Sequence, residues 1–266
     1  MTSAMHTPFP PDPIHVADAL ASAPLAGTGT LAQQVYVLLR KLVVDLTLMP
    51  NQFLSEKDVA DGLRISKTPV REAFIRLAED DIVNIMPKSG TYVSVIDMNR
   101  LNEGFFICRA LCSSCAARLA GASSLRDIDS LRNLIASRKQ VLEQNEYSKS
   151  QAVIIQFHSA IVALADFPSA QKLLESATFE IDRIGNMLRM HTLHAFGDAV
   201  AELTEIVNAI AIHDERQAKR LVSAHIDKMN AFINDLTRNR DFWEHLDYMN
   251  RKRTGKRRQK GNGAKQ

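Results

Sequence analysis

The apolar positions of the chain recur at helical spacing from about Thr30 onward. Thr30 and Gln33 have the spacing of a capping box, in which a Ser or Thr begins a helix and a Glu or Gln follows three residues later. The periodic pattern then runs until Pro50, which cannot continue a helix. A first helix is therefore predicted, with these residues on its apolar face: Val35, Leu38, Leu39, Leu42 and Leu46.

Two shorter helices are predicted next, each behind a serine in the N-cap position. Ser55 precedes the segment Glu56–Leu63, and Ser66 precedes a segment that runs to about Asp80. Only Arg64 and Ile65 separate Leu63 from the second cap. Two short helices joined by so tight a turn are typical of a helix-turn-helix.

A β-hairpin is predicted directly after these helices. The β-rich segments 82–86 and 91–95 flank Pro87-Lys88-Ser89-Gly90, which has the composition of a turn with a basic tip. Three helices followed by a hairpin make the winged form of the helix-turn-helix.

The rest of the chain, from about Met98 to Leu236, is helical in period and contains no segment that resembles a strand. Breaks in the pattern predict about six helices. An antiparallel bundle of this kind can enclose a ligand pocket or present a dimer face. The breaks fall at residues 121–124, 146–148, 167–168, 196–197 and 213–214.

Composition at the two ends completes the division of the chain. The first residues contain most of the prolines and show no sustained period, which favours disorder. The fold class is thus mainly α. The expected segments are a disordered lead-in (1–29), a winged helix-turn-helix (30–97), a helical domain suited to an effector pocket or a dimer face (98–250) and a basic disordered tail (251–266).

The charge of the chain is unevenly distributed. The formal net charge is +3, but the tail holds eight of the 33 basic residues and no acid, so the remaining 25 bases face 30 acids. A mildly acidic body predicts that DNA binding comes from a localised surface rather than from general attraction. The tail itself is either a solubilising end or a nonspecific contact to DNA.

Targeting signals and cysteine usage indicate where the protein works. The chain has neither a basic start followed by an apolar run nor an apolar window long enough for a membrane helix, so we expect a cytoplasmic protein. Three cysteines, an odd number, argue against a secreted disulfide framework. Cys108, Cys112 and Cys115 share one helical face. We expect them to be small buried side chains; the alternative is a thiolate metal site or a redox switch.

The motifs around the predicted helix-turn-helix resemble those of the GntR family of winged-helix transcriptional regulators. The longest is the unbroken run Ser66-Lys67-Thr68-Pro69-Val70-Arg71-Glu72-Ala73. The others are Leu54-Ser55-Glu56, Val59-Ala60, Arg76-Leu77 and Gly90-Thr91-Tyr92-Val93.

The side chains of the predicted third helix also favour contact with DNA on physical grounds. Hydroxyl and basic side chains gather at its first turns, where free backbone N–H groups and the positive end of the helix dipole favour a phosphate. Arg71, one turn further in, can reach guanine O6 and N7 in the major groove. The resemblance implies the following DNA contacts: Lys57, Ser66, Lys67, Thr68, Arg71, Lys88, Ser89 and Gly90.

The chain departs from the usual GntR pattern at two of these positions. Lys67 stands where Arg is usual, and Lys cannot make a planar two-pronged contact, so base reading there weakens or becomes a phosphate contact. Arg64 occupies a turn position where Gly is common. It either strains the turn or adds a contact.

The helical remainder resembles, more diffusely, the FadR-type C-terminal domain called FCD. The resemblance implies a pocket for a small effector, in which Arg109 faces the ligand and an anionic group is favoured. The residues that carry it are Arg109, Ala116-Ala117-Arg118-Leu119-Ala120, Phe157-His158, Ala209-Ile210, Asp214, Ala218 and His225-Ile226.

Many FCD domains hold a divalent metal such as zinc or nickel through one Asp and three His. In this chain Ile154 and Leu203 stand at two of those positions, which leaves only His158 and His225. We therefore expect no cofactor, unless these two imidazoles hold a metal with help from His191 or His194. With Ile154 and Leu203 in its lining, the pocket favours a ligand with apolar bulk or no ligand at all.

The resemblance to the GntR family implies a homodimeric DNA-binding repressor of a near-palindromic operator, modulated by a small metabolite. The chain contains no glycine-rich phosphate loop, nucleophile elbow or metalloprotease His-Glu pair, so an enzyme is not expected. The remaining alternative is a helical protein whose winged helix binds a protein partner.

Overall fold

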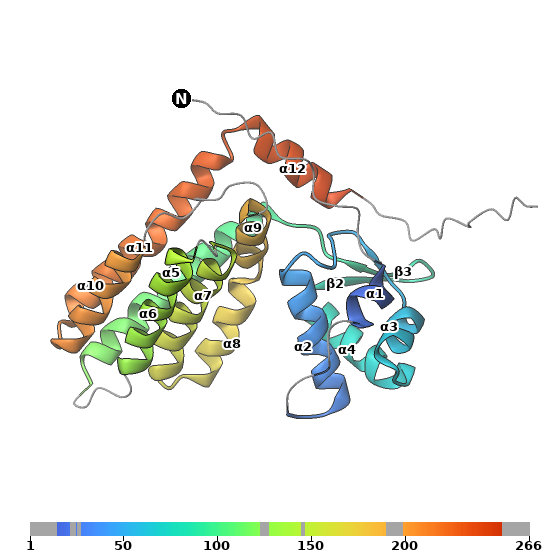
Figure 1. The fold of residues 1–266 in the computed structure, drawn as a ribbon, viewed down its shortest axis with the longest axis horizontal. Coiled ribbons are helices and arrows are strands. Elements are labelled where there is room, and N and C mark those ends of the chain that lie inside the picture. The colour runs from blue at the N-terminus through green and yellow to red at the C-terminus, as the bar shows by residue number, and fades with distance from the viewer. Residues whose placement is uncertain are drawn as a thin grey trace, which may run out of the picture. The chain divides into compact units, whose positions relative to one another are not determined.

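The computed structural model describes residues 15–21, 25, 28–122, 128–144, 147–189 and 199–251 (Figure 1). The chain forms two compact units. One comprises the described residues up to Val95 together with those from Asp247 onward; the other comprises the described residues between Ile96 and Leu246. His191, His194 and residues 252–266 lie outside the described residues.

The first unit contains the three predicted helices. Helix α2 (Leu31–Val44) begins at Thr30, whose Oγ1 accepts a hydrogen bond from the Gln33 backbone N–H at 3.2 Å, as the cap motif predicts. The helix ends at Val44, earlier than Pro50, because Leu46 adopts a left-handed backbone conformation with φ of 59°. Helices α3 (Glu56–Leu63) and α4 (Lys67–Glu79) have the predicted bounds.

The turn between α3 and α4 is built on the backbone of Arg64. Its φ of 56° and ψ of 43° are left-handed, a conformation that glycine adopts without the steric cost borne by other residues. The expected cap at Ser66 is only half correct. Ser66 occupies the N-cap position of α4, but within the part of the chain that the structure describes its side chain makes no capping hydrogen bond.

A three-stranded antiparallel sheet completes the winged fold. Strands β2 (Val83–Met86) and β3 (Gly90–Val93) form the predicted hairpin, with Ile85 opposite Thr91. The order is β1-β3-β2, where β1 (Phe53–Leu54) pairs with β3 on its other side. Strand β1 was not predicted, because two residues carry no periodic signal.

The expected disordered lead-in is wrong over one short helix, α1 (Val16–Ala21), which packs against α3. Val16, Ala19 and Leu20 are buried. Gly62 lets α1 and α3 approach closely, because a Cβ added at residue 62 would lie 3.1 Å from the Cα of Ala17. Six residues are too few to show a helical period among the neighbouring prolines and alanines.

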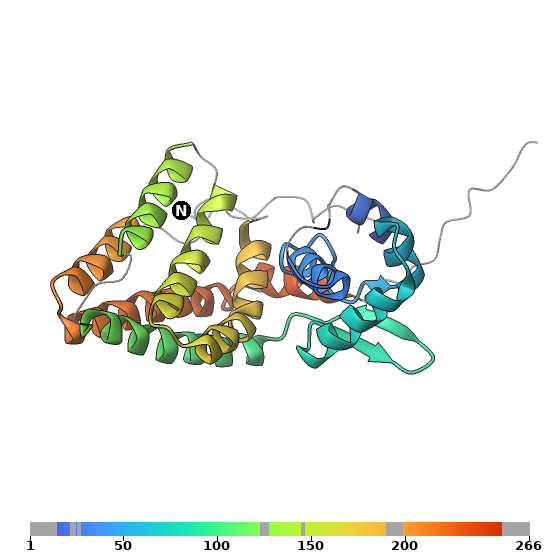
Figure 2. The same ribbon diagram turned by 90° about the horizontal axis from the view of Figure 1, so that it is seen from below.

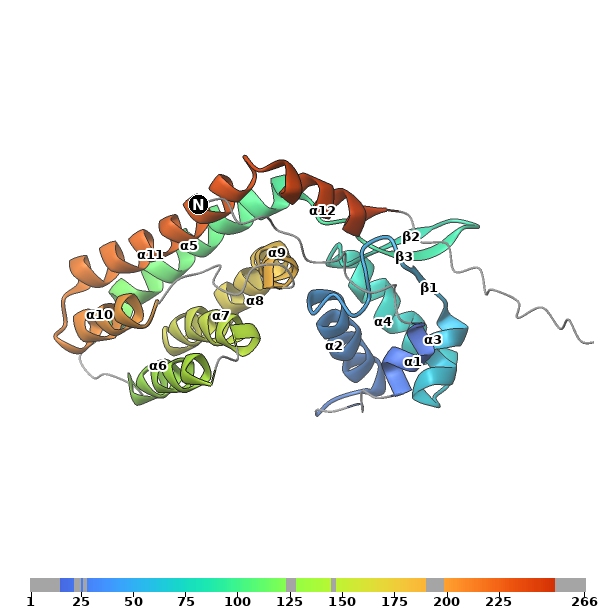
Figure 3. The ribbon, with the colours of Figure 1, turned by 45° about the horizontal axis from the view of Figure 1, so that its top comes forward.

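The second unit is helical, as predicted, with no strand among its described residues. Helices α5 and α11 run side by side, and α5 also packs against α7, α8 and α9 (Figures 2 and 3). The bounds are α5 (Met98–Ala120), α6 (Ile128–Glu143), α7 (Tyr147–Leu164), α8 (Pro168–Ala177), α9 (Phe179–Arg189), α10 (Val200–Ala211) and α11 (Glu215–Leu236). Helix α12 (Arg240–Asn250) has residues in both units.

The expected number of about six helices is too low for two reasons. Thr178 divides one predicted helix into α8 and α9, and its backbone stays in the right-handed helical region, so the apolar period continues through the break. Helix α12 lies beyond Leu236, where no helix was predicted. None of the helices that the structure describes is long and apolar enough to cross a membrane.

Candidate nucleic-acid interface and buried histidine cluster

Helix α4 presents the predicted DNA-contacting side chains to solvent at its first turns. Ser66, Lys67, Thr68 and Arg71 are all exposed. The side chain of Ser66 does not cap the helix, so the first backbone N–H groups of α4 can donate to a phosphate oxygen. The helix stays anchored by its opposite face, where Val70, Ala73, Phe74 and Leu77 are buried.

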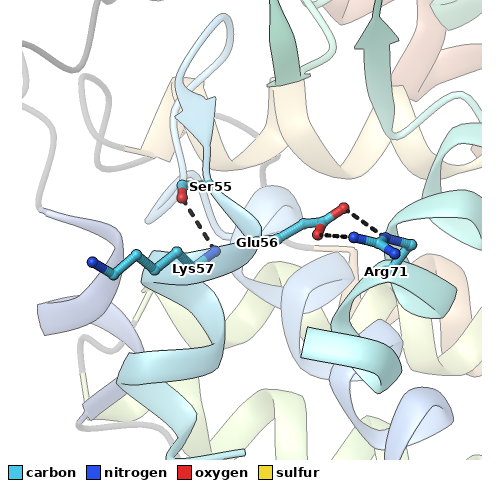
Figure 4. Close-up of polar contacts among 4 residues, drawn as sticks. All are labelled: Ser55, Glu56, Lys57 and Arg71. Carbon is cyan, nitrogen blue, oxygen red and sulfur yellow. Dashed lines mark hydrogen bonds and ion pairs between the residues drawn. The ribbon is translucent and has the colours of Figure 1, made fainter. Parts of the chain in front are cut away.

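Arg71 does not project freely into solvent but pairs with Glu56 at the start of α3 (Figure 4). Its Nε donates to Oε1 at 3.1 Å and its Nη2 donates to Oε2 at 2.9 Å. The hydrogen bonds from Arg71 lower the pKa of Glu56, so the carboxylate is ionised at neutral pH. No spacing in the sequence predicts this pair, because its members are fifteen residues apart on two helices.

Lys57 lies on α3 beside Glu56, but its side chain points away from the pair (Figure 4). Its backbone N–H donates to Ser55 Oγ at 3.2 Å, which fixes the first turn of α3 as the cap prediction requires. The structure thus brings Arg71 and Glu56 together and leaves Lys57 directed elsewhere.

The tip of the hairpin is a tight turn that displays Lys88 and Ser89 to solvent. The Ser89 N–H donates to Met86 O at 3.0 Å, and Lys88 has a left-handed φ of 62°. Gly90 has a φ of 100°, and a Cβ there would lie 2.4 Å from the Phe53 ring. Glycine is therefore required at residue 90, and it lets β1 approach the turn.

In the second unit, His158 on α7 and His225 on α11 meet in the protein interior. Their ring centroids are 5.3 Å apart, and both side chains are buried together with Ile154 and Leu203. The Nε2 atoms of both histidines are buried without a hydrogen-bond partner among the described residues. Unpaired buried polar atoms are rare in folded proteins, so they mark this cluster as a candidate ligand site.

Glu202 on α10 orients one of these rings. His225 Nδ1 lies 2.7 Å from Glu202 Oε2, and Lys228 Nζ pairs with the other carboxylate oxygen. Burial lowers the pKa of His225 to about 4, and the nearby His158 and Arg138 add to that effect, while Glu202 opposes it. The neutral ring then donates from Nδ1 to the carboxylate, which leaves Nε2 as an acceptor.

The arginine near the histidine cluster is Arg138, and not Arg109 as the FCD resemblance implied. Arg109, expected at the effector, is exposed, and its Nε donates to Asp227 Oδ1 at 2.8 Å. Arg138 of α6 is 1% exposed and acts electrostatically on His225. Its position gave one signal: Arg138 is seven residues after the buried Leu131, and therefore on the same face of α6.

The three cysteines are free and buried, as expected for a packing stripe. Cys108 and Cys112 have their Sγ atoms 3.9 Å apart, well beyond a disulfide bond. The hydrogen bond with Cys112 and the neighbouring His158 lower the pKa of Cys108 against the effect of burial, whereas the pKa of Cys112 is raised. The stripe thus borders the histidine cluster.

Two protein-family descriptions match the chain over most of its length. Residues 31–93 match "Bacterial regulatory proteins, gntR family", and residues 103–228 match "FCD domain". The chain belongs to the GntR family. Its winged helix-turn-helix and its helical bundle are the two domains of an FCD-type GntR regulator, and regulators of this kind bind DNA rather than catalyse reactions.

Similar proteins support this membership of the GntR family. The HTH-type transcriptional repressor RspR of Escherichia coli (strain K12) is 26% identical over 216 residues, which cover 81% of this chain and 94% of the relative. An HTH-type regulator in an unstable DNA locus of Streptomyces ambofaciens is 27% identical over 79% of this chain and 86% of its own length. The fold matches that of E. coli McbR/YncC with a TM-score of 0.69 and 20% identity, over 80% of this chain and all of that one.

Of the positions that the FCD resemblance implies for a metal, this GntR-family regulator has His158 and His225 among its described residues, while His191 and His194 lie outside them. Ile154 and Leu203 offer no donor atom, and both side chains are buried. Within the described ranges, no three His, Cys, Asp or Glu side chains form a group that could hold a metal ion. The cluster offers two imidazole Nε2 atoms, with the buried Arg138 close enough to act on His225.

Proposed function

We propose that this GntR-family regulator is a homodimeric repressor that reads a near-palindromic operator with α4 and responds to a small effector bound at the histidine cluster. The observation that carries the DNA-reading part is the exposed start of α4, where hydroxyl, amide and cationic groups lie together. The name of the E. coli relative supports repression. The role also places the protein in the cytoplasm, where bacterial DNA is.

In this proposal the contacts to DNA divide into two kinds. Lys67, Thr68 and the free N–H groups of α4 hold phosphates, while Arg71 reads a guanine in the major groove. Lys88 and Ser89 at the hairpin tip contact the adjacent minor groove or its phosphates. Two copies related by a twofold axis would place two α4 helices in successive major grooves, which accounts for a near-palindromic site.

Selection of bound duplexes from a random DNA pool tests the DNA-reading role. The expected outcome is one enriched near-palindrome whose two half-sites are about one helical turn apart. Light scattering of the bound complex should give two chains per duplex. A pool in which no sequence is enriched would instead favour binding of a protein partner.

The effector part rests on the chemistry of the buried cluster. His225 Nε2 is free to accept a hydrogen bond from a ligand, Arg138 supplies positive charge, and Ile154 and Leu203 supply apolar side chains. These groups suit a small anion that carries a hydrogen-bond donor and some apolar bulk. Calorimetric titration with a panel of hydroxylated and amino-substituted carboxylates tests this class. Binding that survives His158→Ala together with His225→Ala would place the effector elsewhere.

A further inference from the structure

We propose that Glu56 is a positioning residue for DNA reading, which holds the guanidinium of Arg71 by one edge so that the opposite edge is presented to a base. This inference rests on the DNA-reading role proposed for α4. Glu56 is on α3, one helix away from the reading helix, and it approaches Arg71 with both carboxylate oxygens (Figure 4).

The geometry of the pair selects which edge of Arg71 remains free. Guanidinium carries five N–H groups, and a carboxylate that bonds Nε and Nη2 occupies its side edge. The end edge, with one N–H group of Nη1 and the second N–H group of Nη2, stays open. Those groups have the spacing that pairs with guanine O6 and N7.

The pair also limits the number of orientations that Arg71 can adopt before DNA arrives. The Arg71 side chain is 66% exposed, and without a partner it would sample many rotamers. Glu56 is itself anchored: Ser55 Oγ accepts hydrogen bonds from the N–H groups of Lys57 and Asp58, which fixes the first turn of α3. A fixed helix turn therefore holds the carboxylate, and the carboxylate holds the arginine.

This arrangement has two consequences of opposite sign. A negative charge close to the DNA surface weakens attraction to phosphates of any sequence, whereas a fixed arginine sharpens the choice of base. Removal of the charge from Glu56 should therefore strengthen binding to unrelated DNA and weaken discrimination. A residue with a merely structural role would not shift the two quantities in opposite directions.

The test uses the full chain and two variants, Glu56→Gln and Asp58→Asn, which each remove one carboxylate charge from the first turn of α3. Affinity is measured by fluorescence anisotropy, at one salt concentration, for the selected operator and a scrambled duplex of equal length. We expect Glu56→Gln to reduce the ratio of the two affinities about ten-fold. Its affinity for the scrambled duplex should rise. Asp58→Asn should raise affinity for both duplexes alike and leave the ratio unchanged.

A double-mutant comparison separates positioning from a direct contact between Glu56 and DNA. In an Arg71→Ala background, Glu56→Gln should no longer change the ratio, and this comparison stays decisive if the single variant is less stable. An unchanged ratio for Glu56→Gln in the native background overturns the inference, as does an equal loss of affinity for both duplexes. If the unaltered protein enriches no sequence, the DNA-reading proposal itself fails, which is a separate outcome.

Discussion

The two candidate sites of this protein are built in opposite ways. The proposed DNA-contacting surface consists of exposed charged and hydroxyl side chains from two helices and a hairpin that are close in sequence. The histidine cluster consists of buried side chains from α6, α7, α10 and α11, with one ring held neutral by burial. A surface that binds a polyanion needs charged side chains exposed to solvent. A selective pocket instead needs polar groups that are buried away from water.

The difference shows in how far each site could be predicted. The bounds of α3 and α4 follow from local signals, a serine before each helix and apolar positions within it. Four of the proposed DNA contacts, Ser66, Lys67, Thr68 and Arg71, share one short motif, so the sequence alone indicates them together. Arg138 and Glu202 reach the histidines through packing between helices, and no spacing in the sequence shows that.

The largest expected effect is on the DNA surface. Arg71→Ala removes the only base-reading side chain assigned to α4, and discrimination between operator and scrambled duplex should fall about 10- to 100-fold for each half-site. The exposed side chain contributes little to folding, so the circular dichroism spectrum and melting temperature should not change. Gel shifts with both duplexes measure the effect. A variant that still selects the operator would assign base reading to another residue.

The next effect tests the buried site through pH. The pKa of His225 is lowered from 6.5 to about 4 in the folded chain, so the unfolded chain takes up its proton first as the pH falls. Stabilisation from the neutral ring is thus complete above pH 6.5 and is lost as the pH approaches 4. Between pH 7.5 and pH 5 the loss from this group should be about 2 kcal/mol.

Urea unfolding of the native protein and of His225→Phe at those two pH values measures this loss. Phenylalanine keeps a ring but cannot take up a proton, so the variant should lose about 2 kcal/mol less than the native chain when the pH is lowered. Equal losses would show that the ring of His225 is not kept neutral by burial. DNA binding at pH 7.5 without effector should be the same for both proteins.

A smaller effect distinguishes holding DNA from reading it. Lys88→Ala should weaken binding to operator and scrambled duplex by the same few-fold factor, because a contact to phosphate carries no sequence information. The slope of log affinity against log salt should become shallower by about one for each chain bound. A change in the ratio of the two affinities would instead make Lys88 a reader of bases.

The smallest effect concerns the turn between α3 and α4. Arg64 has a left-handed backbone at a cost of about 1–2 kcal/mol, and glycine would remove that cost while increasing the entropy of the unfolded chain. Arg64→Gly should therefore stabilise the protein by less than about 1 kcal/mol, as measured by urea unfolding. A loss of stability would mean that the arginine side chain makes a compensating contact.

Misplaced expectations also have physical causes. Helix α1 and strand β1 are too short to show a period, and the break between α8 and α9 does not interrupt one. Arg109 looked like a ligand contact by resemblance, yet a pairing with Asp227 holds it at the surface. In each case the deciding interaction is made by a residue distant in sequence or by the backbone alone.

Strand β1, only two residues long, fixes the working dimensions of the DNA-binding unit. It lies between α2 and α3 in the chain and pairs with β3, and the ring of Phe53 lies against Gly90 at the turn. These contacts therefore keep the distance between helix α4 and the hairpin tip constant. In the proposed dimer each half-site footprint is constant, and an effector can change only the distance from one footprint to the other.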